Sequence, residues 1–169
     1  WVDFELIVRC AEKYPHVSFV IMGKETTDTS ILNQRPNIIH LDHVPYEDLP
    51  RYAEHFDVGL IPRRINRLTV AMNPIKLLEY LALGMPVVST GLPEVRKFCD
   101  LVFVAEDDDQ FVKLVGEALN DNTPEKRRSR RAHAEKFSWQ SVAERMGDVI
   151  QGIDRRKALS RGSRQATIL

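Results

Sequence analysis

Apolar residues recur along this chain at two alternating periods, one helical and one extended. A helix is predicted over residues 3–14, where the apolar positions follow helical spacing up to Pro15. A buried strand is predicted over residues 17–22, an apolar and β-branched stretch with Gly23 behind it. Further strands are expected at 38–41, 57–61, 86–89 and 101–104, and the intervening helices at 46–55, 74–83 and 93–98. Helices and strands that alternate in this way predict an α/β fold with a parallel sheet.

The predicted strands are predominantly apolar and do not alternate with polar residues, which is typical of strands that are covered on both faces. We therefore expect a doubly wound, Rossmann-like sheet with helices on each side. Three more helices are predicted after the sheet, over residues 108–119, 125–135 and 139–153, with Ser138 as the cap of the last one. The chain then divides into a domain over residues 1–153 and a flexible basic tail over residues 154–169.

The chain starts directly at a predicted helix, whereas a doubly wound sheet ordinarily begins with a strand and a glycine-bearing turn. We expect a first strand, and an N-terminal domain before it, to precede Trp1 in the complete protein. On this interpretation the chain is the carboxyl-terminal half of a larger protein.

Composition narrows the setting but does not select a partner. The chain is 43% hydrophobic and 28% charged, and its 24 basic residues balance its 24 acidic residues. This is the profile of a soluble globular domain, and no apolar run approaches the length of a membrane-spanning helix. The two cysteines, Cys10 and Cys99, are too few for a disulfide framework, and Cys10 lies among apolar residues of its helix. We therefore expect a reducing, cytoplasmic location.

The segment 57–90 contains the residues with the most informative chemistry. It is predicted to be strand, loop, helix and strand, with Asn73 as the helix cap, Pro74 in the first turn and Gly84 as a left-handed end. In open parallel sheets, ligands bind beyond the carboxyl ends of the strands, where loops meet the positive ends of helices. The free amides at the start of this helix, with Lys76 beside them, therefore predict a site for phosphate.

Glu79 lies three residues after Lys76, on the same helical face and ~4.5 Å further along the axis. A carboxylate there would repel a phosphate, but its two oxygens can accept hydrogen bonds from neighbouring hydroxyls. A nucleotide joins anionic phosphates to a ribose diol, so the two side chains together match one ligand. The alternative is an ordinary surface helix, in which Lys76 is solvated and Glu79 pairs with it.

The run NPIKLLEYLALGMPVVSTGLPEV, residues 73–95, resembles the signature of GT-B glycosyltransferases of the group 1, family 4-like type. The pattern Pro-x-Lys-x-x-Glu-Tyr-x-Ala-x-Gly-x-Pro-Val-Val is matched throughout, from Pro74 to Val88. The similarity extends from Phe4 to about Val104. It implies the C-terminal, donor-binding domain of an enzyme that transfers a glycosyl unit from a nucleotide-diphosphate sugar.

The resemblance also implies roles for individual residues. The glutamate matching Glu79 holds the donor ribose, the lysine and amides at the helix start hold the pyrophosphate, and the loop matching 43–45 borders the base. The donor-binding residues expected here are Met72, Asn73, Pro74, Lys76, Glu79, Tyr80, His43, Val44 and Arg63. Catalytic residues are expected in the other domain, and neither a metal nor a cofactor is expected to be required.

The sequence departs from the family pattern at two places. Many retaining members carry a second glutamate eight residues before the ribose-binding one, and that position is Ala71 here. Neither the role of that glutamate nor a stereochemical outcome is therefore carried over. The family's basic residues after the first strand lie outside this sequence. Arg63, Arg64 and Arg67 of the loop are candidates for that phosphate charge, with solvated arginines as the alternative.

Other polar clusters have simpler explanations. His40, Asp42 and His43 lack a fourth ligand for a metal, and the acidic run 106–109 precedes a helix that it can cap, with calcium binding as the alternative. The basic run 126–131 is expected to form a solvated helix face, with an anionic membrane surface as the alternative. No nucleic-acid partner is expected, because no reader motif is recognised. We expect the two tryptophans to pack against neighbouring residues; they are Trp1 and Trp139.

The sequence thus predicts a glycosyltransferase domain in the cytoplasm, with contact at the membrane surface as the alternative to a solvated basic face. Its expected partners are a nucleotide sugar, a saccharide or lipid-linked acceptor, and the N-terminal domain of the same enzyme. The isolated domain is expected to bind nucleotide weakly and to transfer no sugar. Two alternatives remain open, namely a nucleotide-sugar epimerase or hydrolase of the same fold and a non-catalytic α/β regulatory module.

Overall fold

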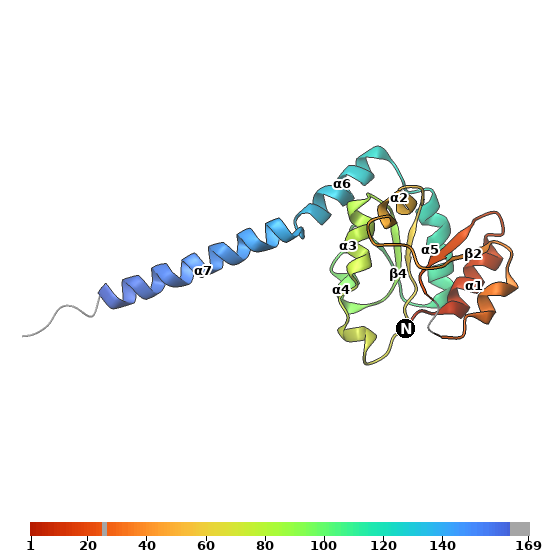
Figure 1. Cartoon of the computed structure of the whole chain (residues 1–169), viewed down its shortest axis with the longest axis horizontal. Coiled ribbons are helices and arrows are strands. Elements are labelled where there is room, and N and C mark those ends of the chain that lie inside the picture. Colours follow the sequence, from red (N-terminus) through yellow and green to blue (C-terminus); the bar gives the residue numbers. More distant parts are fainter. Residues whose placement is uncertain (25–26, 163–169) are drawn as a thin grey trace, which may run out of the picture.

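The protein has an α/β fold in which short strands alternate with helices (Figure 1). The computed structural model describes residues 1–24 and 27–162, with residues 154–162 described as helical backbone only. The strands are β1 (Phe19–Met22), β2 (Ile38–Leu41), β3 (Gly59–Ile61), β4 (Val87–Thr90) and β5 (Phe103–Ala105). The α-helices are α1 (Phe4–Lys13), α2 (Leu49–Ala53), α3 (Ile75–Ala82), α4 (Pro93–Arg96), α5 (Asp108–Leu119), α6 (Pro124–Glu135) and α7 (Trp139–Gly162). Two 3₁₀ helices that the periodicity does not predict are η1 (Ser30–Gln34) and η2 (Thr69–Ala71).

The strands form two parallel sheets where a single sheet was predicted. β1 pairs with β2, from Phe19 beside Ile38 to Met22 beside Leu41. In the second sheet β4 lies between β3 and β5, parallel to both. The predicted α/β class and the parallel strand direction are confirmed, but the described residues do not form one continuous sheet. Strand pairing depends on neighbours that are distant in the sequence, so hydrophobic periodicity alone does not predict it.

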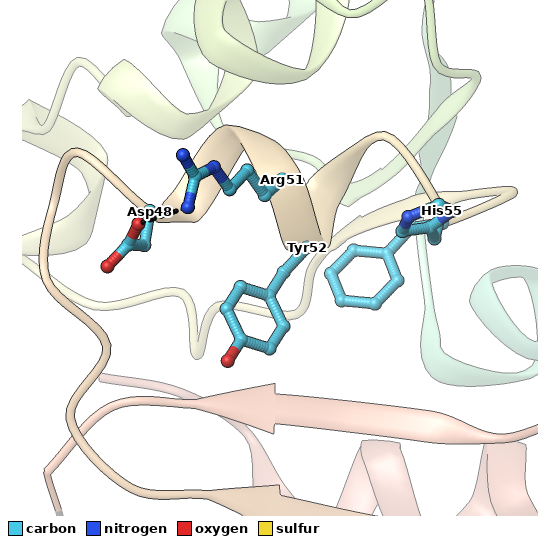
Figure 2. Close-up of a pocket in the computed structure, with 5 residues that line it drawn as sticks. Asp48, Arg51, Tyr52 and His55 are labelled. Atoms are coloured by element: carbon cyan, nitrogen blue, oxygen red, sulfur yellow. Dashed lines mark hydrogen bonds and ion pairs between the residues drawn. The ribbon is translucent and has the colours of Figure 1, made fainter.

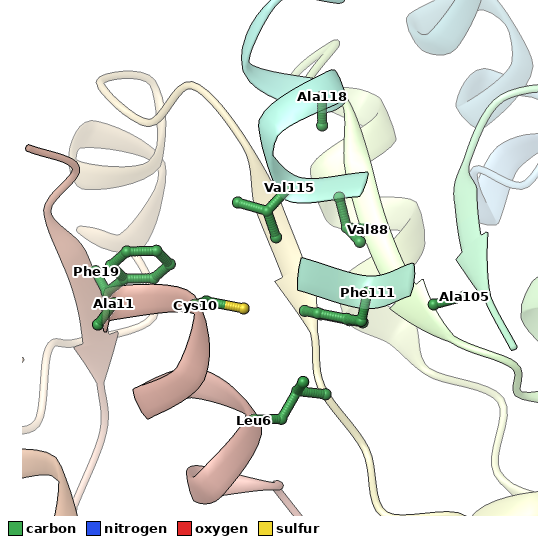
Figure 3. Packing of buried hydrophobic residues seen from close by; sticks show 9 residues of the cluster. All are labelled: Leu6, Cys10, Ala11, Phe19, Val88, Ala105, Phe111, Val115 and Ala118. Carbon is green, nitrogen blue, oxygen red and sulfur yellow. The ribbon is translucent and has the colours of Figure 1, made fainter. Parts of the chain in front are cut away.

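Helices cover both faces of the three-stranded sheet. Val88 of β4 belongs to a core with Cys10 of α1 and Phe111 of α5 (Figure 3). Val87, the preceding residue of the same strand, belongs to a second core with Leu77 of α3, together with residues of α4 and α6. Because neighbouring residues of a strand point to opposite faces, the two cores lie on opposite sides of the sheet. This is the two-sided covering that the apolar strands predict.

Side chains before two helices act as the caps that the sequence predicts. Asp107 Oδ1 accepts a hydrogen bond from the Gln110 amide at 2.8 Å, and the helix that follows has the predicted bounds, Asp108–Leu119. Capping by the acidic run is therefore confirmed at this residue. Ser138 Oγ accepts a hydrogen bond from the Ser141 amide at 3.2 Å, which confirms Ser138 as the cap of α7.

The basic run 126–131 lies in α6 and holds that helix against α3. Arg130 is only 3% exposed, and its guanidinium donates to the Asp121 carboxylate at 2.5 Å and to the Gly84 carbonyl oxygen at 3.4 Å. The Arg131 guanidinium donates to the Leu83 carbonyl oxygen at 3.1 Å. The two carbonyl groups that directly follow α3 thus find donors in α6. The prediction of a solvated helix face is wrong for Arg130, because a charged side chain can be buried where acceptors surround it.

The last helix, α7, projects away from the two sheets (Figure 1). It continues past the predicted end at Ile153 to Gly162, and residues 163–169 of the predicted tail lie outside the described residues. Trp139 at the start of this helix is 88% exposed, and Trp1 is 67% exposed. The prediction that both pack against neighbours is therefore wrong, because each lies where the chain enters or leaves the packed layers.

Candidate functional site

The loop between β3 and α3 is held in place by its own side chains. Asn66 Oδ1 accepts a hydrogen bond from the Thr69 amide at 3.0 Å, and the buried Thr69 hydroxyl donates to the Arg64 carbonyl oxygen at 2.6 Å. Thr90, at the end of β4, accepts from the Arg63 amide at 3.2 Å and donates to the Arg63 carbonyl oxygen at 2.9 Å. The loop therefore holds Arg63 at the carboxyl edge of the sheet, where ligands of this fold class bind.

The start of α3 lies one residue later than the sequence predicts. Pro74 is the N-cap, with an extended backbone (φ −76°, ψ 102°), and Ile75 is the first helical residue. The prediction of Asn73 as the cap is wrong, because Pro74 occupies the cap position and leaves Asn73 exposed before it. The first amides of a helix have no acceptor within the helix, and the proline has no side-chain acceptor to offer them. These amides of α3 are therefore suited to an anionic ligand.

Lys76 and Glu79 lie on one face of α3 and form an ion pair. The Lys76 Nζ to Glu79 Oε2 distance is 2.8 Å, and the side chains are 46% and 28% exposed. The surface-helix alternative predicts this pair, whereas the donor-site interpretation makes no prediction about it. Its partial exposure leaves both charged groups accessible from solvent.

Tyr80 determines how closely α3 approaches β3. Its ring lies against the backbone of Gly59, where the Cβ of any other residue would collide with the ring. Burial raises the pKa of Tyr80, and the nearby Glu79 carboxylate raises it further. Glycine in β3 therefore permits a close contact that sets the position of the helix carrying Lys76 and Glu79.

The remaining predicted donor-binding residues divide between two loops. Met72 is half-buried beside the buried Pro74, so both belong to the approach to α3. His43 and Val44 follow β2 in the other sheet, and the His43 amide donates to the carboxylate of the preceding residue at 2.7 Å. The structure thus brings Arg63 and residues 72–80 together through the β3–α3 connection, whereas His43 and Val44 lie in a separate loop.

Two threonines support the site and were missed from the sequence. Thr69 is buried within η2, and Thr90 connects the end of β4 to the loop. Their positions within the segment 57–90 were a usable signal, because a hydroxyl at the carboxyl end of a parallel strand lies next to the loops of that edge.

Neither of two open cavities in the described part of the chain is lined by a residue of α3. One is beneath α2 and is lined by Asp48, Arg51, Tyr52, His55 and Phe56 (Figure 2). The other lies where α6 meets α7. Neither cavity is lined by a residue predicted to bind the donor.

The histidine and acidic cluster near β2 has a local explanation. His40 Nε2 lies 2.9 Å from the Gly23 carbonyl oxygen, so this ring bridges the ends of β1 and β2. Among the residues that the structure describes, no group of three or more histidine, cysteine or acidic side chains is arranged to hold a metal ion.

Comparison with known proteins relates this fold and site to one family. The family model for glycosyl transferases group 1 matches residues 4–121. TuaH of Bacillus subtilis (strain 168), assigned as a glycosyltransferase of teichuronic acid biosynthesis, is 33% identical over 100 residues, which cover 57% of this chain and 25% of TuaH. The α,α-trehalose 6-phosphate synthase of Burkholderia multivorans superposes with a TM-score of 0.66 at 17% identity, covering 98% of this chain and 41% of that structure. WaaG, a glycosyltransferase involved in lipopolysaccharide biosynthesis, superposes with a TM-score of 0.62 at 17% identity, covering 89% of this chain and 43% of WaaG.

The chain matches less than half the length of each of these relatives. The two superpositions show that the fold is that of GT-B glycosyltransferases, as the resemblance in residues 73–95 implies. No helix in the described part of the chain has both the length and the apolar character needed to cross a membrane. Because the family model matches well over half of its residues, the chain belongs to the group 1 glycosyltransferases.

Proposed function

We propose that this chain binds the nucleotide-diphosphate sugar from which a glycosyltransferase transfers its glycosyl unit. The observation that carries the proposal is the start of α3, where amides without a cap acceptor, Lys76 and Glu79 share one face. The amides and the ammonium group suit the diphosphate, and the carboxylate suits the ribose diol. Arg63, held by Thr90 at the same edge, adds charge for the phosphates.

The proposed role in catalysis is electrostatic. When the bond between the sugar and the diphosphate breaks, negative charge grows on the leaving phosphate oxygens. The α3 amides and the Lys76 ammonium would stabilise that charge from fixed positions. Glu79 would hold the donor and take no part in bond breaking. Ligand binding would replace the 2.8 Å ion pair, with phosphate taking the place of Glu79 beside Lys76.

The proposed acceptor is a saccharide or a lipid-linked saccharide at the cytoplasmic membrane surface. Two relatives support this class, because TuaH is assigned to teichuronic acid biosynthesis and WaaG to lipopolysaccharide biosynthesis. The acceptor would bind to a part of the enzyme outside this chain, in an N-terminal domain. We therefore propose that the 169-residue chain binds nucleotide but transfers no sugar.

Calorimetric titration with UDP, GDP and ADP tests the site. The chain is expected to bind at least one of them with a millimolar or lower dissociation constant. Glu79→Gln removes the charged acceptor for the diol and is expected to weaken binding about 10- to 100-fold, the value of one or two charge-assisted hydrogen bonds. Lys76→Met is expected to weaken binding of the nucleoside diphosphate more than binding of the corresponding nucleoside, which lacks the phosphates.

The matched control is the ion pair of α4. Lys97 Nζ lies 2.6 Å from Glu94 Oε2 with the same i,i+3 spacing as the α3 pair. Glu94→Gln is expected to leave nucleotide affinity unchanged. Absence of binding by all three nucleotides at millimolar concentration, or equal effects of Glu79→Gln and Glu94→Gln, would show that the site is wrongly assigned.

A further inference from the structure

The loop between β3 and α3 exposes apolar side chains and buries a polar one. Ile65, Leu68 and Val70, together with Ile75 at the start of α3, are 43–63% exposed. We call these four residues the loop patch. Thr69, which lies between two of them in the sequence, is completely buried. This distribution is the reverse of the usual one, and exposed apolar side chains that lie together indicate a surface that contacts another molecule.

Hydrogen bonds within the loop hold the patch in its exposed position. The Thr69 hydroxyl donates to the Arg64 carbonyl oxygen at 2.6 Å and accepts from the Asn66 amide at 2.9 Å. Asn66 Oδ1 in turn accepts from the Leu68 amide at 2.9 Å. Turning the apolar side chains inward would leave the buried hydroxyl without these partners, at a cost in free energy. Exposure of the loop patch is therefore a property of the folded loop.

The loop patch lies at one end of the packed layers. Figure 1 shows η2, in yellow, below α4 and at the end of the molecule opposite α6. Leu68 directly precedes η2, and Val70 lies within it. Ile75 directly precedes Lys76, so the patch adjoins the start of α3. The loop patch and the proposed donor site therefore share one edge of the domain.

The charge around the loop patch is basic only. Residues 58–78 contain four basic residues and no acidic residue, in a chain whose opposite charges balance. Two of the four, Arg64 and Lys76, form ion pairs with carboxylates outside this segment. Arg67 lies between two patch residues in the sequence and is exposed, and it forms no ion pair with the residues that the structure describes. Its guanidinium is therefore available to an external phosphate.

Other exposed surfaces of the domain lack this combination. Helix α7 exposes Met146 and Ile150, but it also exposes the acidic side chains of Glu144 and Asp148. Those carboxylates would be repelled by an anionic surface. The basic run 126–131 has the opposite composition, because it contains no apolar residue. Apolar and unpaired basic side chains without neighbouring carboxylates thus distinguish the loop patch from these two surfaces.

We propose that the loop patch binds the surface of an anionic lipid bilayer. The four aliphatic side chains would enter the boundary between headgroups and hydrocarbon, and Arg67 would pair with lipid phosphates. A bilayer requires no matching shape, only apolar side chains beside basic ones. A second copy of the chain is a weaker candidate, because a symmetric contact through this patch would bring Arg67 close to its counterpart without a carboxylate from the segment.

This contact would hold the start of α3 beside the lipid headgroups. Because Ile75 and Lys76 are adjacent, a donor bound at α3 would lie close to the membrane surface. The glycosyl unit would then be presented where a lipid-linked acceptor is located. This consequence rests on the proposed function, whereas the membrane contact itself does not.

Sedimentation with vesicles, in the absence of nucleotide, tests the contact. The 169-residue chain is expected to bind vesicles of equal parts phosphatidylglycerol and phosphatidylcholine, and to bind pure phosphatidylcholine vesicles at least about 5-fold more weakly. Ile65→Ser combined with Leu68→Ser should lower the partition coefficient at least about 10-fold, because less apolar surface leaves water. Arg67→Gln should lower it about 5-fold, the effect of one basic residue at such a surface.

The matched control is the pair of substitutions Met146→Ser and Ile150→Ser in α7, where the side chains are 61% and 58% exposed. This variant is expected to bind the anionic vesicles like the original chain. No binding by the original chain, or equal losses in the loop and α7 variants, would overturn the proposal. So would self-association that depends on the loop patch without vesicle binding, because it would assign the patch to a second copy.

An environment-sensitive fluorophore locates the contact directly. Cys99 is exposed and would be replaced by serine, whereas Cys10 is buried and protected from labelling. A fluorophore on Leu68→Cys is expected to shift its emission to the blue when anionic vesicles are added, and one on Met146→Cys is expected not to shift. The reverse result would overturn the proposal. Calorimetry with nucleotides tests the donor site separately, so failure of one proposal is distinguishable from failure of the other.

Discussion

Lys76 and Glu79 can exchange their mutual contact for a ligand at small cost. Their ion pair is 2.8 Å long, but the two side chains are 46% and 28% exposed. Ion pairs with this exposure typically contribute less than about 1 kcal/mol to the free energy of unfolding. A diphosphate and a diol that each offer stronger, oriented hydrogen bonds would therefore displace the pair. The same two residues that stabilise the helix weakly without a ligand are suited to binding one.

The two cysteines have opposite environments. Cys10 of α1 is completely buried in the core that α1 forms with α5 (Figure 3). Cys99, in contrast, is exposed. Burial raises the pKa of the Cys10 thiol to about 12. The position of Cys10 among apolar residues of its helix agrees with this burial, and the burial gives the fold a specific response to alkaline pH.

We predict that stability falls between about pH 9 and pH 11 through Cys10. In the unfolded chain a thiol loses its proton above about pH 8.5, while folded Cys10 keeps its proton until about pH 12. The free energy of unfolding therefore drops by up to about 1.4 kcal/mol per pH unit in this window. Urea denaturation at pH 8 and pH 10 should show a drop about 1–2 kcal/mol larger for the original chain than for Cys10→Ala. Cys99→Ala should retain the larger drop; identical pH dependence in Cys10→Ala and the original chain would contradict the prediction.

At the scale of the elements, α6 is held to α3 by a buried ion pair. The side chain of Arg130 is 4% exposed and that of Asp121 is 17% exposed. Burial lowers the pKa of Arg130, while the Asp121 carboxylate opposes this shift. Because the guanidinium also donates to the Gly84 carbonyl oxygen, the pair connects the end of α5, the end of α3 and the middle of α6.

We predict that Asp121→Ala strongly destabilises the fold. The substitution leaves Arg130 buried without its carboxylate, a change that costs about 3–5 kcal/mol in comparable buried pairs. Chemical denaturation followed by circular dichroism measures the loss. The control is Glu125→Ala, which breaks the 3.0 Å pair with Arg128, in which both side chains are about 70% exposed. That control should cost less than about 1 kcal/mol, and equal losses in the two variants would refute the role given to burial.

At the scale of the whole molecule, the packed layers end with α6, and α7 extends beyond them (Figure 1). Met146, Val149, Ile150 and Ile153 of α7 are each 47–63% exposed. In contrast, Arg130 and Ala134 of α6 are buried against the rest of the domain. The stability of the layers should therefore depend on α6 and not on α7.

We predict that a chain ending at Gln140 melts within about 2 °C of the 169-residue chain, because it loses few buried contacts. A chain ending at Asn120 also lacks α6, Asp121 and Ala134, and it should lose cooperative unfolding altogether. Thermal denaturation of the three chains provides the comparison. A large decrease in the melting temperature of the first truncation would show that α7 packs on the domain.

Much of the fold could be predicted, because most of its elements have strong local determinants. The predicted bounds 38–41 and 108–119 are those of β2 and α5. The prediction was less accurate where tertiary contacts determine the ends of a helix. The helix expected over residues 46–55 is observed as the shorter α2, Leu49–Ala53. The shared face of Lys76 and Glu79 follows from helical spacing, whereas the hydrogen bonds of Thr90 to Arg63 do not, because 27 residues separate them.

The amino-acid sequence was enough to predict the order and type of the strands and α-helices, the left-handed end of α3 at Gly84 and the placing of an ammonium and a carboxylate on one helical face. These are local consequences of side-chain spacing, capping and the conformational freedom of glycine. The tertiary structure was needed to show that the described strands pair as two sheets and that Arg130 is buried beside Asp121. Hydrogen bonding and burial between distant segments depend on which surfaces meet in space, and a local pattern of residues does not specify that meeting.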